Sequence, residues 1–256
     1  MMVRLLKTPK MKMIFALLFI FITASTGLFY RFLFSLLFAV AVDMTLLKIR
    51  KIDYFFPSAG IISAIIINLL LAPNLSFFEL LLTILIAIVS KHFLRINKKH
   101  ILNPAAIGLF LGGLIFGHGV SWWAVSWQQL TFPFFTFLIL LLPGYISCFK
   151  MRRFKIVASF LLIYNLYYLI FARTITLFDP TVLFFSLVML SEPMTTPSNY
   201  KSQFLFGIFV SVITLLISFQ ASIFIPDPLI VALLVGNAVF FKWRENWLVL
   251  KLKKKV

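Results

Sequence analysis

The sequence predicts an all-α polytopic membrane protein, with about ten transmembrane helices arranged as a five-plus-five inverted repeat with short broken helices. Three observations predict this fold class: an apolar composition, an uneven distribution of basic residues, and a repeated spacing of prolines. The 256 residues are 62% hydrophobic and 12% charged, with a mean hydropathy of +1.06. Because a soluble domain of this length does not bury so much apolar surface, residues 1–256 are expected to form a single integral membrane domain in a lipid bilayer.

The expected helices follow from the apolar segments, taken in chain order. These segments cover roughly 13–29, 32–47, 58–73, 77–90, 104–118, 132–148, 155–171, 175–190, 203–224 and 229–241. Several hold only about 14 to 17 residues, which as helices reach about 21 to 25 Å, less than a hydrocarbon core of about 30 Å. We expect either broken helices completed by non-helical chain that is buried in protein, or a bilayer that thins around them.

The basic residues predict the orientation. With the N-terminus inside, 22 of the 24 Lys and Arg residues fall in inside loops, and the outside loops hold only Arg31 and Arg173. The positive-inside rule then gives ten spans in the plasma membrane, with both termini and a basic tail at 242–256 in the cytoplasm. The same distribution explains the net charge of +17 without a nucleic-acid partner. A cleaved signal peptide is the alternative for the first segment, which would leave nine spans.

Four prolines suggest that the chain is built from two similar halves. Pro57 and Pro104 are 47 residues apart, Pro180 and Pro228 are 48 apart, and each precedes a short apolar stretch. The halves would be repeat 1 at about 13–118 and repeat 2 at about 132–241. Five spans in each half would invert the second half relative to the first and create a site between the repeats. A chance match of proline positions is the alternative.

Three acidic residues lie at positions that invite a functional role. Asp43 falls within the second segment, where an intramembrane acid is a functional candidate, although its side chain could instead extend toward Lys48 and Arg50. Asp179 and Asp227 each precede a repeat proline. An Asp before Pro at a helix start is a good N-cap, so capping is the expected role and ligand binding the alternative.

Two polar interruptions form the candidate site. Glu192 lies in the stretch LSEPMTTPSN, where two prolines prevent a continuous helix, and Asn103 lies in KKHILNPAA at the start of the fifth segment. The free N–H groups at that helix start suit an anionic or electron-rich group. We expect the two interruptions to meet around a shared cavity at the inner side, with ordinary connecting turns as the alternative. The candidate binding residues are Asn103, Pro104, Glu192, Pro193, Thr195, Thr196 and Pro197.

Other residue types add little chemistry. Trp122, Trp123 and Trp127 are expected to form an aromatic belt at the outer membrane surface. The single cysteine, Cys148, excludes a disulfide within the chain. His92 and His100 lie eight residues apart in a basic stretch, so no metal or haem site is expected. No nucleotide-binding glycine motif, CxxC pair or His-Glu metal motif occurs.

Four segments resemble the NqrB/RnfD family of membrane subunits. KHILNPAAIGL resembles that family's K-H-x-F-N-P-A-A segment, and LSEPMTTPSNYKSQFLFGI resembles its T-D-P-V-T-x-P segment, with Glu192 in place of the usual Asp. The stretches KIRKIDYFFPSAGIISAIIINLLLAP and IPDPLIVALLVGNAV also resemble family segments, in the same order and spacing over roughly residues 32–245. The resemblance implies a core membrane subunit of an electron-transport complex, coupled to Na⁺ or H⁺ movement, that binds flavin.

One departure from the family concerns how flavin would be held. Typical members carry an S-G-A-T segment whose Thr is esterified to FMN, and no Gly-Ala-Thr occurs here. We therefore expect any flavin, FMN or riboflavin, to be bound non-covalently. The partners implied are other subunits of such a complex or a soluble flavin or iron–sulfur reductase, and whether the chain is catalytic alone stays open. A channel or transporter for a small solute, built on the same repeat, is the alternative, and a purely structural anchor is a third.

Overall fold

The computed structural model describes residues 8–24, 27–52, 56–96, 99–126, 133–220 and 223–244. In this part of the chain ten α-helices form, with one short hairpin of β1 (Arg95–Ile96) and β2 (Lys99–His100) as the strand content. The first five helices are α2 (Pro9–Ala24), α3 (Phe29–Ile49), α4 (Ser58–Leu70), α5 (Phe77–Phe93) and α6 (Pro104–Phe116). The second five are α7 (Pro133–Tyr145), α8 (Phe154–Tyr167), α9 (Pro180–Phe184), α10 (Tyr200–Ser218) and α11 (Pro228–Val239).

Four short irregular turns extend helices of the second five. The π-helical turns η1 (Ile146–Lys150), η2 (Tyr168–Ala172) and η3 (Phe185–Met189) continue α7, α8 and α9, and the 3₁₀ turn η4 (Phe240–Arg244) continues α11. Each of the ten predicted apolar segments thus coincides with one helix, which confirms the all-helical prediction. The ends differ most at three segments: the first begins at Pro9, the eighth begins only at Pro180, and the ninth ends at Ser218.

Helix length separates two groups. Three helices are long and apolar enough to cross a membrane: α3 with 21 residues, α8 continued by η2 with 19, and α10 with 19. The other apolar helices are shorter, as predicted from the segment lengths. The described chain is therefore a mostly helical protein with three helices able to span a membrane, and the count of about ten spans stays a prediction.

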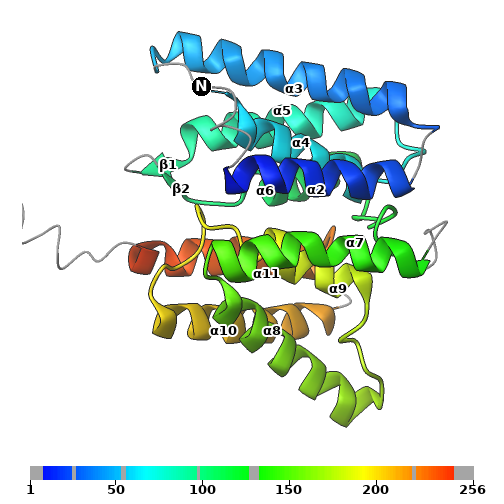
Figure 1. Ribbon diagram of the computed structural model, residues 1–256, viewed down its shortest axis with the longest axis vertical. Coiled ribbons are helices and arrows are strands. Elements are labelled where there is room, and N and C mark those ends of the chain that lie inside the picture. The colour runs from blue at the N-terminus through cyan, green and yellow to red at the C-terminus, as the bar shows by residue number, and fades with distance from the viewer. Residues whose placement is uncertain are drawn as a thin grey trace, which may run out of the picture.

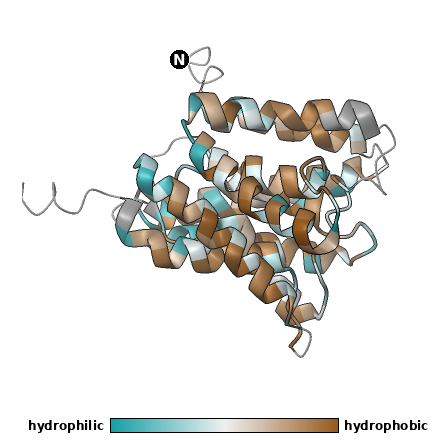
Figure 2. Ribbon diagram, turned by 90° about the horizontal axis from the view of Figure 1, so that it is seen from below, coloured by the Kyte–Doolittle hydropathy of each residue, from teal (hydrophilic) through white to brown (hydrophobic). Residues whose placement is uncertain are grey.

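The two halves of the chain occupy two separate layers (Figure 1), with α2–α6 in one and α7–α11 in the other. Successive helices run back and forth along one direction, so the loops gather at two ends of the molecule. We call the end that holds the loops after α3, α5, η1 and η3 the basic end. Among the described residues, Arg31 and Arg173 are the two Lys or Arg residues that lie at the opposite end, and Figure 2 shows the apolar character of the helices between.

Several helix contacts of the first half recur in the second, although the contacts of α4 with α5 and with α6 have no counterpart of similar extent there. In the first half α2 packs on α4, α3 packs on α4 and α5, and α5 packs on α6. In the second half α7 packs on α9 and η3, α8 packs on η3 and α10, and α10 packs on α11. The halves meet where α2 contacts α7 and α6 contacts α11. These are helices at the same position in each half, an arrangement that a two-fold axis between the halves permits, and the inverted repeat itself stays a prediction.

Side-chain caps explain why three of the short helices start where they do. Asp179 Oδ1 accepts a hydrogen bond from the Thr181 N–H at 2.8 Å, and Asp227 Oδ1 accepts one from the Ile230 N–H at 3.0 Å. Asn103 caps α6 in the same way through the Ala106 N–H, at 3.0 Å. In each case Pro follows at the first helical position, where its missing N–H costs nothing. The capping roles predicted for Asp179 and Asp227 are confirmed.

The tryptophan prediction is wrong for the two residues that the structure describes. Trp122 and Trp123 are each only 6% exposed, and their indole N–H groups donate to Asp227 Oδ2 and to the Asn68 carbonyl, both at 2.8 Å. Their loop folds inward because α4 ends at Leu70, whose carbonyl accepts from the N–H groups of Ser121 and Trp122. Trp127 lies outside the described residues, as does the tail beyond Arg244.

Labelling of introduced cysteines tests the sidedness of the two ends. In a Cys148→Ser background, we expect a membrane-impermeant maleimide added to intact cells to label Asn74→Cys, in the exposed turn after α4, but not Lys201→Cys at the basic end. Lysed cells should label at both positions. Equal labelling of both positions in intact cells would contradict the orientation.

A second test concerns the buried cap at the start of α11. Asp227 uses one carboxylate oxygen for Ile230 and the other for Trp122, whereas an Asn amide would present N–H₂ toward one of these donors. We expect Asp227→Asn to lower the free energy of unfolding by about 1 to 3 kcal/mol, measured by SDS titration in mixed micelles. Asp179→Asn is the matched control and should be nearly neutral, because Asn caps a helix as well as Asp does. Equal effects of the two changes would show that the Trp122 contact contributes nothing.

Candidate functional site

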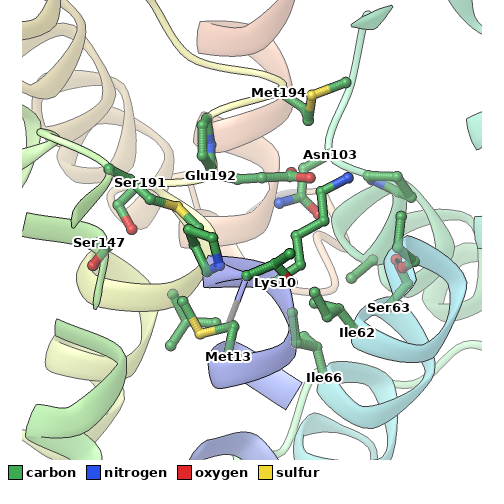
Figure 3. Close-up of a pocket in the computed structure, with 18 residues that line it drawn as sticks. Lys10, Met13, Ile62, Ser63, Ile66, Asn103, Ser147, Ser191, Glu192 and Met194 are labelled. Carbon is green, nitrogen blue, oxygen red and sulfur yellow. Dashed lines mark hydrogen bonds between the residues drawn. The ribbon is translucent and has the colours of Figure 1, made fainter. Parts of the chain in front are cut away.

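A cavity of about 480 Å³ lies between the two halves, toward the basic end (Figure 3). The first half contributes the starts of α2, α4 and α6, and the second half contributes η1, η3 and the loop that follows η3. Its walls are mainly apolar, with side chains such as Met13, Ile62, Ile66 and Val188. Four of the seven predicted site residues line this cavity: Asn103, Pro104, Glu192 and Pro193.

Asn103 joins three segments at the edge of the cavity. Its backbone N–H donates to Asn237 Oδ1 in α11 at 2.9 Å, and its side-chain amide donates to the Met189 carbonyl in η3 at 3.4 Å. Its side-chain oxygen is used for the α6 cap. The two polar interruptions of the sequence therefore meet, because one buried asparagine binds to both halves of the protein.

The remaining predicted residues hold Glu192 in place rather than line the cavity. Thr195 Oγ1 donates to Glu192 Oε2 at 3.1 Å, and Thr196 Oγ1 donates to the Glu192 carbonyl at 2.6 Å. The buried guanidinium of Arg153 donates to the carbonyls of Pro197 and Pro193. Glu192 thus sits on a loop whose own hydroxyls and carbonyls are already engaged, and the threonines act by positioning it.

The polar groups of the wall divide into acceptors and one cation. The hydroxyls of Ser63, Ser147 and Ser191 donate to backbone carbonyls, at 3.0, 2.7 and 2.7 Å, so they present lone pairs to the cavity. Figure 3 shows the Lys10 side chain extending toward Glu192 and Asn103. An apolar cavity with a cation, a carboxylate and an amide close to one another suits a molecule with an apolar body and one polar edge.

Two of the π-helical turns form part of the wall. Their wider hydrogen bonds run from the Met151 N–H to the Ile146 carbonyl at 3.1 Å, and from the Leu190 N–H to the Phe185 carbonyl at 2.8 Å. Ser147 and Val188, one from each turn, face the cavity. Single π-helical turns are often found at functional sites, and no feature of the sequence predicted them.

A buried charged cluster was also missed. The prediction that Asp43 extends toward Lys48 and Arg50 is wrong, because its carboxylate is fully buried and contacts Lys91 Nζ and, at 2.6 Å, His92 Nε2. The available signal was the helical spacing of Ser35, Ala39 and Asp43, which marks the buried face of α3. The basic partners lie 48 and 49 residues further along the chain, where no pattern connects them to Asp43.

The two histidines at the basic end lie in separate polar contacts. Within the described ranges, no group of three His, Cys, Asp or Glu residues is close enough to hold a metal ion. His100 is buried in the hairpin, where its Nδ1 lies 3.1 Å from the Lys91 carbonyl. Burial and then the charge of Lys91 lower the pKa of His100 from 6.5 to about 4.

Comparison with known proteins assigns no family: no family model matches the chain, and no curated protein matches it either. The cavity, its residues and the motif resemblance are therefore the basis for the proposed function.

The neutral state of His100 predicts a loss of stability in mild acid. Below pH 6.5 the unfolded chain takes up a proton that the folded protein, with a pKa of about 4, does not, so stability falls as the pH falls from 6.5 toward 4. Between pH 7 and pH 5 this contribution amounts to about 2 kcal/mol. We expect His100→Gln to make the pH dependence of SDS unfolding over this range shallower by about this amount. Asn74→Gln, in the exposed turn after α4, changes no titratable group and is the control, so it should leave the pH dependence unchanged. A pH dependence as steep in His100→Gln as in the wild type would contradict this assignment.

Proposed function

We propose that this chain is a multi-pass protein of the plasma membrane, with ten crossings, an inverted repeat and both termini in the cytoplasm. Three features support the proposal: the alternating path of the helices, the matching contacts of the two halves, and the concentration of basic residues at one end. Helices as short as α4 and α6 satisfy the bilayer only if loops complete them inside the protein. The loop after α6 does this for α4, through Ser121, Trp122 and Trp123.

We further propose that the chain is a membrane subunit of an electron-transport complex similar to the NqrB/RnfD family, passing electrons across or along the membrane with coupling to Na⁺ or H⁺ movement. One observation carries this proposal. The two segments with the strongest resemblance to that family, around Asn103 and around Glu192, come together at a single cavity although they lie 89 residues apart. A ligand site between the repeats would make use of this meeting of two distant polar segments.

A flavin fits the cavity that these residues form. The volume lies within the range of about 300 to 1,000 Å³ typical of small-molecule sites. The apolar wall suits the tricyclic ring of FMN or riboflavin, and Asn103, Glu192 and Lys10 can meet its polar edge. A bound flavin would supply one- and two-electron transfer. Without an S-G-A-T segment the chain offers no family-type attachment site, so the flavin is held by these contacts alone.

The basic end is the side at which a redox partner would exchange electrons with the cavity. The partner is another subunit of the complex or a soluble flavin or iron–sulfur reductase. In this role the chain carries electrons as one part of a translocase, and the complete reaction needs the donor subunit.

A small-solute channel or transporter is the second candidate. The observation that favours it is the position of the cavity between the halves, toward the basic end, while the loop at 117–126 fills the opposite end. Transporters built from inverted repeats place their substrate sites between the repeats and open them to one side at a time. Flux of small neutral solutes into proteoliposomes would favour this function over electron transfer.

Flavin retention tests the proposed function. Protein reconstituted in nanodiscs with riboflavin should retain it through dialysis and quench its fluorescence. We expect Glu192→Ala and Asn103→Ala to insert normally and to weaken binding by about tenfold to a hundredfold, because each removes a hydrogen bond worth about 1.5 to 3 kcal/mol.

The matched control for this test is Asn199→Ala. Asn199 caps α10 through the Lys201 N–H but does not line the cavity, so its loss should leave binding unchanged. Intact-protein mass spectrometry of chain made in cells with a flavin transferase should show no added FMN. Wild-type protein that binds no flavin, or variants that bind as well as wild type, would refute the site.

A further inference from the structure

The buried cluster of Asp43, Lys91 and His92 joins α3 to the last turn of α5. One carboxylate oxygen of Asp43 contacts Lys91 Nζ, and the other lies 2.6 Å from His92 Nε2. Asp43 is 0% exposed, and His92 is 1% exposed. Since a carboxylate only accepts hydrogen bonds, His92 Nε2 carries the hydrogen in this contact.

The protein holds this cluster in place from several directions. Arg50 donates from the end of α3 to the His92 carbonyl, and His100 lies against the Lys91 carbonyl, so the free carbonyls at the end of α5 have partners. On the third side, Gly60 of α4 leaves room for the carboxylate. A Cβ at that position would lie 2.5 Å from Asp43 Oδ2, so α4 reaches this close only because residue 60 is Gly.

The cluster lies directly behind the wall of the cavity. Ala59 and Ser63 line the cavity, while Gly60, between them in sequence, contacts Asp43. Only the first turn of α4 therefore separates the charged cluster from the cavity. A change of charge in the cluster would act on the cavity over a short distance of low dielectric.

A tether between helices explains only part of this arrangement. The outer face of α3 is exposed, with Phe34 60% and Leu37 57% accessible, so a polar contact does help to hold this helix. One buried ion pair would serve that purpose, and burying ions is costly. Here a second basic group shares the carboxylate, and His92 Nδ1 is buried with no hydrogen-bond partner. That nitrogen can take up a proton without any loss of the existing contacts.

We propose that Asp43, Lys91 and His92 form an intramembrane proton-binding site, in which His92 Nδ1 takes up and releases the proton. Asp43 favours the protonated imidazole, and Lys91 opposes it by competing for the same carboxylate. The other charged or titratable groups around the site are Arg50 just after α3, Lys10 on α2, Arg95 on β1 and His100 on β2. Gly60 is the residue that faces the carboxylate from α4, and it is neutral. The site requires no flavin and is independent of the proposed redox function.

Histidine NMR tests the proposal directly, because the chain contains only three histidines. Protein with isotope-labelled histidine in nanodiscs would be titrated from about pH 5 to about pH 9, and each resonance assigned with a His→Gln variant. We expect the His92 resonance to change reversibly between the neutral and the doubly protonated ring. Asp43→Asn should lower the proton affinity of His92 about tenfold, and Lys91→Met should raise it by a similar factor.

A purely structural tether would not change the proton affinity of His92 in opposite directions in the two variants. The two opposite shifts therefore distinguish proton binding from a structural role. Asp179→Asn is the control for loss of a carboxylate and should leave His92 unchanged. If Asp43→Asn fails to fold, the titration of His92 in the wild type and in Lys91→Met still tests the proposal. The proposal is overturned if the His92 ring keeps one protonation state over the whole range, or if neither folded variant moves its titration.

Discussion

The structure depends on one constraint: in an apolar chain, every backbone group freed at the end of a short helix needs a partner inside the protein. The described helices satisfy this constraint with side-chain caps and with a loop that folds inward. Asn103, Asp179 and Asp227 cap helix starts, and the loop after α6 supplies donors to the carbonyls at the end of α4. Each of these partners except the one for α9 also bridges segments that are distant in sequence. The ends of the short helices are therefore the places where the fold is assembled.

The same constraint explains why the cavity lies where it does. Asn103 ends one interruption and reaches η3 and α11, so the Glu192 loop is drawn to the start of α6. The π-helical turns widen the backbone next to it, and the apolar side chains of α2 and α4 cannot fill the space between the halves. The polar rim and the apolar interior of the cavity therefore follow from the capping of broken helices and do not require a ligand. The ligand site that we propose at these breaks would use groups that the capping has already placed there.

The sequence predicted the helices well and the side-chain partners poorly. Apolar segments and Asp-Pro or Asn-Pro starts are local signals, and they located all ten helices and the caps at Asp179 and Asp227. The partners of Trp122 and Asp43 are 105, 48 and 49 residues away, so composition and spacing carry no information about them. Each was assigned to the nearest plausible environment, lipid headgroups or neighbouring cations, and each instead binds across the fold. The cavity was predicted only because both of its polar segments break a helix.

Two kinds of polar site therefore coexist in one apolar protein, and they differ in what they can do. At the cavity the hydroxyls and Asn103 are committed to backbone groups, so this site is rigid and suited to holding a molecule. In the cluster behind it, Asp43 balances Lys91, and His92 can add one positive charge without displacing either. Because Gly60 is the contact between them, a larger residue there would push the carboxylate away from both basic partners. The first turn of α4 is thus the element through which the charge of the cluster and the contents of the cavity can affect each other.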